Sequence, residues 1–326
     1  MAERNLAQAL TMALDHVLAS NPDVLVMGED VGVAGGVFRI TDGLQQKHGT
    51  ERVVDTPVAE SGIVGTAFGM AVAGLRPVAE IQFLGFAYPA LDQIVSHVSR
   101  IRNRSRHRFT APLVIRIPYG AGIGAAEHHS ESTEAIFAHT PGLKVVVPAT
   151  PADAAGLLLT AVADPDPVIF LEPIRSYRRM RGEVSEPPTA VPFGEAARRA
   201  TGDDLTFITY GAMVPDVLAA AGELEAAGIK ADVLDLRTLV PLDRDAVLES
   251  VQRTGRAVIV QEGHRTCGFA AELAATIQEE ALYSLEAPVR RVTGWDTVVP
   301  LRRAEHHYVP TVDRIVAAAQ AVLEGV

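Results

Sequence analysis

The chain has 326 residues, 48% hydrophobic and 21% charged, a composition typical of a soluble globular protein with apolar side chains for two cores. The formal net charge of −11 argues against nucleic-acid binding, which needs a basic face, and suits basic protein partners. The single Cys267 excludes an intrachain disulfide, and no signal peptide or membrane-spanning run is present, so we predict a cytoplasmic protein without membrane contact.

The amino-terminal segment predicts a helix, a strand and a loop. Apolar residues recur with helical spacing from Asn5 to Ser20, and Asn21-Pro22 ends the pattern. The strand covers Asp23 to Met27. The glycine-rich residues 28–36 then predict a surface loop, with closure over a site as the alternative.

Residues 55–77 place one carboxylate at the start of an otherwise apolar helix. Glu60 precedes Gly62, Gly65 and Gly69, whose three- and four-residue spacing puts them on one helical face. We expect another backbone to pack closely against this face, since each glycine costs about 1 kcal/mol of helix propensity relative to alanine. Taken alone, Glu60 has a simpler interpretation as a charge favoured by the helix dipole.

A buried strand is predicted from Val78 to Phe83, and Phe86 follows its carboxyl end. Open α/β sheets bind their ligands at that end of the strands. We therefore expect Glu60 and Phe86 in one crevice. A helix from Pro89 to about Arg102 comes next, and its arginine-rich continuation to Arg108 predicts a solvated face, with an acidic partner or phosphates as alternatives.

Residues 120–134 are predicted to form a flexible loop that follows a strand and carries titratable side chains. The series Gly120-x-Gly122-x-x-Ala125 fits the loose dinucleotide fingerprint, but no amphipathic helix begins at Gly124 and no acidic strand end follows about twenty residues later. The His128-His129 pair lacks the spacing of zinc ligands. Such a loop is suited to catalysis.

Strands and helices alternate along the rest of the chain, which predicts two mostly parallel sheets and an α/β fold. Three prolines and weak periodicity mark residues 181–194 as a linker. The further predicted strands are Leu113–Ile117, Lys144–Pro148, Val168–Leu171, Leu205–Tyr210, Ala231–Leu236, Ala257–Gln261 and Val289–Val292, and the helices are Ala152–Ala163, Pro215–Ala227, Asp243–Arg253, Gly268–Glu280 and Thr311–Leu323.

Two segments resemble the beta subunit of the thiamine-diphosphate-dependent 2-oxoacid dehydrogenases. One runs from Glu60 to Phe86, and the other contains His129-Ser130, Glu134-Ala135 and His139-Thr-Pro141-Gly142. The resemblance covers essentially the whole chain. It implies two doubly wound α/β domains: a thiamine-diphosphate pyrimidine-binding-type domain (1–180), the linker, and a transketolase C-terminal-like domain (195–326).

The resemblance also implies roles for three residues. Glu60 would hydrogen-bond the aminopyrimidine ring of the cofactor, which needs a carboxyl group there to become reactive. Phe86 would pack against the same ring. His129 would act on the bound intermediate or on the incoming lipoyl group, since histidine titrates near neutrality.

The family binds the diphosphate and its magnesium through a Gly-Asp-Gly motif, which this sequence lacks. The chain therefore resembles half of a site. We expect an alpha subunit to hold the diphosphate end in a heterotetramer of two alpha and two beta subunits, and the chain to be active only there.

The resemblance further implies an acyltransferase core that carries lipoyl domains, with Glu286 and Asp296 as acidic docking residues. We predict a branched-chain 2-oxoacid as substrate, with pyruvate or acetoin as the alternative. A noncatalytic scaffold subunit and a self-sufficient transketolase-like enzyme are alternatives from other classes. A structural potassium ion is also implied, bound chiefly by backbone carbonyls of Ala111, Leu113, Ala161, Asp164 and Asp166.

Overall fold

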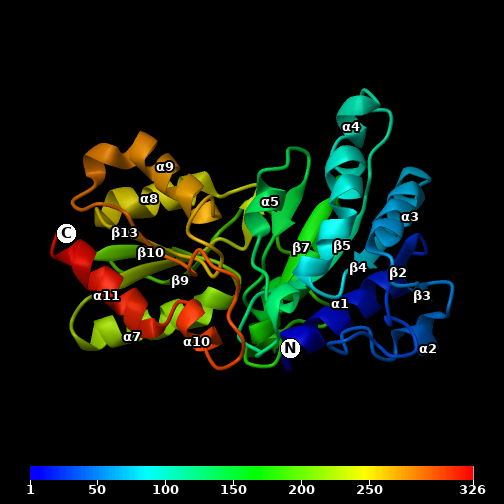
Figure 1. The fold of residues 1–326 in the computed structure, drawn as a ribbon, viewed down its shortest axis with the longest axis horizontal. Helices are drawn as coiled ribbons and strands as arrows, with labels where there is room; N and C mark the ends of the chain where they lie inside the picture. The colour runs from blue at the N-terminus through cyan, green and yellow to red at the C-terminus, as the bar shows by residue number, and fades with distance from the viewer. Residues whose placement is uncertain (326) are drawn as a thin grey trace.

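The computed structural model describes residues 1–325 and has two α/β units side by side (Figure 1). The first unit has a seven-stranded sheet in the order β12-β6-β7-β5-β4-β2-β3, parallel except where β12 meets β6. Its strands are β2 (Val24–Gly28), β3 (Val53–Asp55), β4 (Arg76–Glu80), β5 (Val114–Tyr119), β6 (Lys144–Val146), β7 (Val168–Pro173) and β12 (Thr238–Val240).

Helices cover both faces of this sheet because successive strand residues point to opposite sides. In β2, Val24 and Val26 pack with α1 (Leu6–Ser20) and α6 (Pro151–Ala163), whereas Leu25 and Met27 pack with α3 (Glu60–Val72). A capping box between Asn5 and Gln8 begins α1. The short helix α2 (Leu44–His48) precedes β3.

The helix predicted from Pro89 to Arg102 is broken into three pieces. A 3₁₀ run, η1 (Leu84–Ala90), is followed by a π-helical turn (Gln93–Val98) and by α4 (Ile101–Arg104). Pro89 lies inside η1, so the predicted start of the helix falls within a 3₁₀ run that already begins at Leu84. The arginine-rich residues after it lie largely at the surface, as predicted for a solvated face.

The second unit has a five-stranded sheet in the order β14-β13-β10-β11-β9, parallel except for β9. Every helix and strand predicted for this half is present, so the doubly wound α/β class is confirmed. The edge strand β9 was not predicted. The elements are β9 (Ala197–Ala200), β10 (Leu205–Thr209), β11 (Ala231–Asp235), β13 (Ala257–Val260), β14 (Arg290–Val292), α7 (Val214–Ala226), α8 (Arg244–Thr254), α9 (Phe269–Ala281), α10 (Glu305–Tyr308) and α11 (Val312–Leu323).

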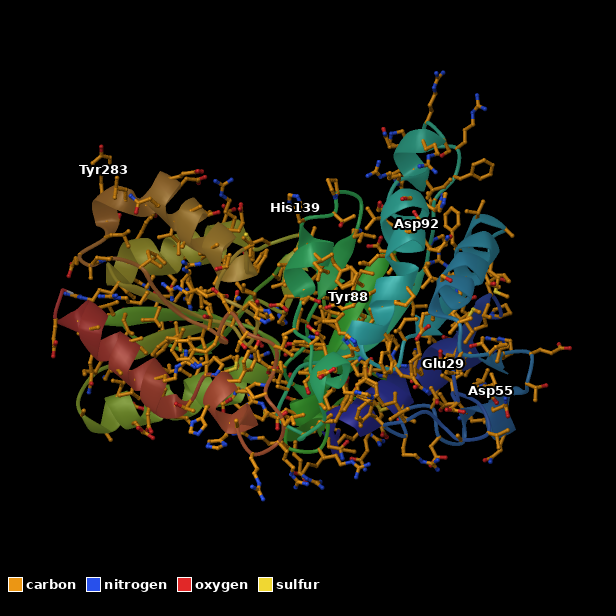
Figure 2. All side chains as sticks on the ribbon, viewed as in Figure 1. Glu29, Asp55, Tyr88, Asp92, His139 and Tyr283 are labelled. Carbon is orange, nitrogen blue, oxygen red and sulfur yellow. The ribbon has the colours of Figure 1, made fainter. Side chains whose placement is uncertain are left out.

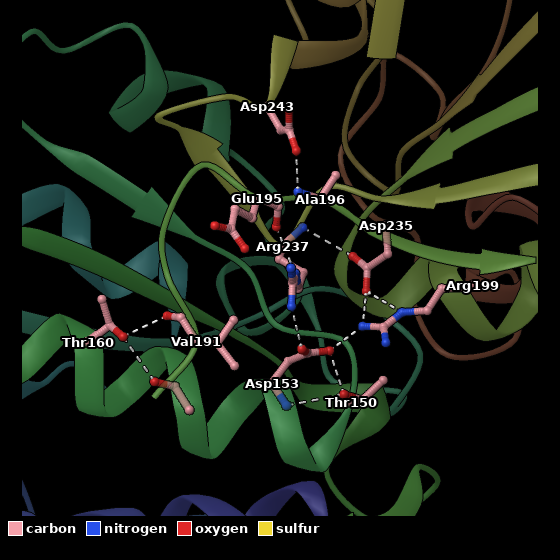
Figure 3. Close-up of polar contacts among 11 residues, drawn as sticks. Thr150, Asp153, Thr160, Val191, Glu195, Ala196, Arg199, Asp235, Arg237 and Asp243 are labelled. Atoms are coloured by element: carbon pink, nitrogen blue, oxygen red, sulfur yellow. Dashed lines mark hydrogen bonds and ion pairs between the residues drawn. The ribbon is translucent and has the colours of Figure 1, made fainter. Parts of the chain in front are cut away.

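The segment predicted as a linker is packed on the first unit. Its first residues form β8 (Arg181–Val184), which pairs antiparallel with β1 (Ala2–Asn5). The Val191 carbonyl accepts a hydrogen bond from Thr160 Oγ1 at 2.6 Å (Figure 3). The Val191 N–H donates to the Gly156 carbonyl. Backbone pairing rather than sequence composition therefore decides the conformation of this segment.

A buried ion-pair network joins the two units (Figure 3). Asp153, in the first turn of α6, pairs with Arg199 of β9 and with Arg237, whose Nη1 lies 3.1 Å from Asp153 Oδ1. Arg199 also bonds Asp235 at 2.7 Å. Burial raises the pKa of Asp235 to about 6, opposed by Arg199. One hydrophobic core spans both units as well, so the loops of the two units are held in a fixed relation.

Within residues 1–325, no helix combines the length and the apolar character that crossing a bilayer requires.

Candidate active site

The candidate site lies at the carboxyl edge of the first sheet. The strands β3, β2, β4 and β5 are neighbours and run parallel, so the segments that follow them emerge at one edge. Glu29 follows β2, Glu60 begins the helix after β3, Phe86 follows β4, and His129 lies in the loop after β5. Strand order thus brings the three predicted residues to one end of the sheet.

Phe86 and His129 are in direct contact. Their ring centroids are 5.0 Å apart with an edge-to-face arrangement, and Phe83 completes the cluster at 4.6 Å from His129. His129 Nδ1 lies 3.1 Å from the Ala126 carbonyl oxygen. Because that oxygen only accepts hydrogen bonds, Nδ1 carries the proton and Nε2 remains available to a substrate.

Gly85 allows this contact by bringing two loops close together. A Cβ atom at position 85 would overlap the backbone of His128, so only glycine lets η1 approach the 3₁₀ turn η3 (Glu127–His129). The side chain of His128 is 62% exposed and lies 4.0 Å from Glu131. Of the two adjacent histidines, His129 therefore faces the aromatic cluster and His128 faces solvent.

Glu60 is the first residue of α3 and is half-buried. Its neighbour Glu29 is buried, and burial, together with the carboxylates of Glu60 and Asp30, raises the pKa of Glu29. Figure 2 shows Glu29 near Asp55, at the β3 side of the first unit. Sequence reasoning missed Glu29, although its place directly after a buried strand was the available signal.

Among residues 1–325 the glycine face of α3 packs against no other backbone, so that expectation was wrong for the single subunit. A Cβ at Gly69 would meet nothing within 4 Å, and one at Gly65 would meet only the side chain of Gln93. The buried face of α3 is instead formed by Ile63, Val64, Ala67 and Ala71. Val58, just before the helix, is 81% exposed.

The loop after β2 is anchored at its centre. The carboxylate of Asp55 accepts hydrogen bonds from the N–H groups of Gly32 at 2.6 Å and Val33 at 3.2 Å. These bonds fix the loop in this conformation, in which most of residues 28–36 are buried, and closure over a site stays a prediction.

Glu134 lies beneath the histidine loop at the interface of the two units. Its Oε1 accepts a hydrogen bond of 2.7 Å from the Tyr210 hydroxyl of the second unit. Burial raises the pKa of Glu134 to about 7, although the bond from Tyr210 opposes the shift. His139 lies farther along the same segment, beyond the short helix α5 (Glu134–Ala138) (Figure 2).

The residues predicted to bind potassium already have partners within the protein. The carbonyl oxygens of Ala111, Leu113 and Ala161 accept hydrogen bonds from backbone N–H groups, and Arg76 donates to the Asp164 carbonyl. Lys144 pairs with the Asp164 carboxylate, and Arg102 lies 2.6 Å from Asp166. Each of these carbonyl oxygens has two lone pairs, so a bond from one donor does not exclude a cation, and potassium stays a prediction.

The two predicted docking residues also make contacts within the chain. Glu286 pairs with Arg256 at 2.5 Å and remains 59% exposed. Asp296 accepts hydrogen bonds from Thr266 N at 2.9 Å and Oγ1 at 2.6 Å, which hold its pKa below the usual value. The exposed Leu282 and Tyr283 give the region of Glu286 an apolar surface.

Comparisons with known proteins agree with this architecture. Residues 2–180 match the pyrimidine-binding domain of transketolase, and residues 194–315 match the transketolase C-terminal domain. The chain is 49% identical to the pyruvate dehydrogenase E1 component subunit beta of Bacillus subtilis, over 99% of this chain and 100% of that protein. It is 48% identical to the protein of the same name from Acholeplasma laidlawii, over 97% of each. A solved structure described as a split-gene transketolase, an inactive beta4 tetramer, superposes with a TM-score of 0.82 at 27% identity, over 98% of each chain.

Proposed function

The chain belongs to the thiamine-diphosphate-dependent family of 2-oxoacid dehydrogenase beta subunits, and we propose that it forms half of an active site for the oxidative decarboxylation of pyruvate. The acyl group would pass to lipoyl groups of an acyltransferase core. The observation that carries the proposal is the contact of Phe86 with His129 at the sheet edge where Glu60 begins its helix.

The residues at this edge fit the aminopyrimidine end of the cofactor. Thiamine diphosphate supplies, when bound, a carbanion that attacks the carbonyl of a 2-oxoacid. The Glu60 carboxyl would hold a proton at the aminopyrimidine ring, and Phe86 would pack against that ring. His129 would present Nε2 to the substrate, oriented through its Nδ1 contact with Ala126.

The other half of the site is assigned to an alpha subunit in a heterotetramer. The sequence has no Gly-Asp-Gly motif to hold magnesium and the diphosphate. The exposed glycine face of α3 and the exposed Val58 beside Glu60 support a protein surface that another chain covers. The structural relative assembled only from its own beta subunits is described as inactive.

Pyruvate is preferred here to the branched-chain substrate that the sequence suggested. The similar curated relatives named above are pyruvate dehydrogenase subunits. Branched-chain 2-oxoacids carry a larger alkyl group beside the reacting carbonyl, and acetoin carries a hydroxyethyl group in place of the carboxylate, so a substrate panel distinguishes them from pyruvate. If the chain were a noncatalytic scaffold, substitution of Glu60, Phe86 or His129 would not lower turnover.

We assign docking of the acyltransferase core to the surface around Glu286, with Asp296 as a second acidic contact. Glu286 stays exposed despite its pair with Arg256 and would meet basic residues of the partner. Leu282 and Tyr283 beside it would supply the apolar part of the interface. The reaction would take place in the cytoplasm, which the single Cys267 suits.

The function is tested by purifying the chain together with its alpha subunit and assaying oxidative decarboxylation of pyruvate and of branched-chain 2-oxoacids, with oxidative cleavage of acetoin, which has no carboxyl group, assayed beside them. Lipoyl-domain acylation is measured in parallel. We expect turnover with pyruvate that depends on thiamine diphosphate and magnesium. Higher kcat/KM with a branched-chain substrate would reverse the assignment, and no turnover with any of them would favour the scaffold.

Calorimetry with the isolated chain tests the half-site. Without a diphosphate anchor, one carboxyl hydrogen bond and aromatic packing should contribute only a few kcal/mol, so binding of thiamine diphosphate with magnesium should be weak, about millimolar. Addition of the alpha subunit should create a tight site. Micromolar binding and turnover by this chain alone would instead support a self-sufficient enzyme.

A further inference from the structure

The glycine loop before His129 binds a carboxylate of the protein itself. The backbone N–H groups of Gly122 and Gly124 donate to Oε1 and Oε2 of Glu305 at 2.8 and 2.9 Å. Gly122 has φ +102 and Gly124 φ +75, a conformation that glycine tolerates and that turns both N–H groups toward one anion. The loop that partly matches a phosphate-binding fingerprint is thus an anion-binding nest filled by Glu305.

The residues that follow the nest in the chain are hydrogen-bonded to His129 and to its neighbour Ser130. Directly after Gly124, the Ala125 carbonyl accepts a bond of 2.8 Å from the Ser130 hydroxyl, and the Ala126 carbonyl accepts the bond from His129 Nδ1. His129 and its neighbour Ser130 are therefore bonded to the two residues that directly follow the nest held by Glu305. A change in that segment would move the acceptor that orients the ring.

A second carboxylate holds the base of the same loop. Glu262 Oε1 accepts from the Ala121 N–H at 2.5 Å and from the Ser132 hydroxyl at 3.0 Å. The Gly120 N–H donates to the Glu131 carbonyl at 2.9 Å and closes the loop. Glu262 thus fixes both ends of the loop, and Glu305 fixes its middle.

Both carboxylates come from the second unit, while the loop belongs to the first. Glu262 follows β13, and Glu305 begins α10 near the end of the chain. Glu305 is 7% exposed and lines a cavity of about 550 Å³ together with Gly122, Gly124 and Arg302. A buried carboxylate that accepts two N–H bonds is costly to remove, because both donors lose their charged partner.

We propose that Glu305 is a positioning residue for His129: its carboxylate binds the Gly122–Gly124 nest and so holds the imidazole in the orientation that acyl transfer requires. The proposal rests on the function proposed above for His129. In this proposal the second unit orients a residue of the first unit, in addition to making contacts with other subunits.

The test compares Glu305→Ala, Glu305→Gln and His129→Ala in the complex with the alpha subunit. Hydrogen exchange is followed in residues 120–132, together with kcat and KM for decarboxylation and for lipoyl-domain acylation. Glu305→Ala should speed exchange of the loop amides about tenfold, the factor expected for loss of a charge-assisted hydrogen bond. It should lower kcat for acylation more than kcat for decarboxylation, with KM for pyruvate unchanged.

Glu305→Gln keeps the shape of the side chain and one acceptor oxygen, so it should rescue part of both losses, which a mere defect in folding would not show. Asp313→Asn, at an exposed acid on α11, is the matched control and should change neither the hydrogen exchange of the loop nor kcat for acylation. Unchanged loop exchange in Glu305→Ala would overturn the proposal. So would normal acylation in Glu305→Ala while His129→Ala loses it. Normal acylation in both variants would overturn the proposed role of His129 itself.

Discussion

The helix that begins at Glu60 and the loop that carries His129 differ in how they are held. The glycine face of α3 lies open, with nothing within 4 Å of a Cβ at Gly69. The loop before His129 is bonded along its length by Glu262 and Glu305 of the second unit. The loop of His129 is completed by contacts within the chain, whereas α3 has a surface that the described residues do not cover.

This difference indicates which contacts depend on assembly. Backbone N–H groups in a loop need acceptors in the folded subunit, and the second unit supplies them. An exposed helix face has its polar groups bonded internally and tolerates solvent until a partner packs on it. Changes near His129 should therefore show their effect within the subunit, whereas changes on the glycine face of α3 should show it on assembly.

The largest effect is expected at Glu60. Glu60→Gln keeps the size of the side chain but cannot exchange a proton with the cofactor, so decarboxylation by the assembled complex should fall by about 10²–10⁴, the range of general acid–base groups. Glu51→Gln, at an exposed acid elsewhere in the first unit, should leave turnover unchanged. Near-normal turnover of a folded Glu60→Gln complex would remove Glu60 from the site.

A pH-dependent effect is expected from Glu134. Its folded pKa of about 7 lies above the ordinary value of 4.5, so the folded chain holds a proton that the unfolded chain releases between these pH values. Stability should thus fall by about 3 kcal/mol as the pH rises from 4.5 to 7, and then level off. Glu134→Gln should lack this decrease in urea unfolding of the subunit. Parallel pH profiles for both proteins would contradict the assignment.

His129→Ala should separate the two half-reactions. We expect roughly a tenfold larger loss in lipoyl acylation than in decarboxylation with an artificial electron acceptor, since Nε2 is the group presented to the incoming acceptor. The exposed neighbour gives the control, and His128→Ala should affect both assays little. Equal losses in the two assays, or a greater effect at His128, would assign the role to another residue.

The smallest effect should appear on the glycine face. Gly69→Ala should stabilise the isolated subunit by up to about 1 kcal/mol through helix propensity and should weaken assembly with the alpha subunit. Gly222→Ala in α7, also exposed with open space around it, should stabilise equally and leave assembly unchanged. Urea unfolding and sedimentation of mixed subunits measure the two effects. Unchanged assembly in Gly69→Ala would place the interface elsewhere.

Local patterns predicted most of the helices and strands. Hydrophobic spacing and the stop at Asn21-Pro22 located α1, and the alternation of strands and helices gave the α/β class. These predictions succeeded because such patterns act within a few residues. The linker was predicted from prolines and weak periodicity, and this failed for β8, since its strand partner lies at the amino terminus.

The candidate site was predictable only in part. Phe86 and His129 lie in segments that follow predicted strands, Glu60 begins a predicted helix, and a family resemblance identified all three. Glu29 had no such motif, and its proximity to Glu60 follows from the order of β2 and β3 in the sheet. Strand order is a long-range property that no single segment encodes.

The sequence by itself determined the elements, the two-unit division suggested by their alternation, and the residue types at the site. The tertiary structure decided which groups meet. Gly85 is required because η1 touches the His128 backbone, and the nest of Gly122 and Gly124 is filled by Glu305, a residue 183 positions from Gly122. Such contacts depend on how two sheets and their loops pack together, and packing joins residues that the spacing along the chain leaves unrelated.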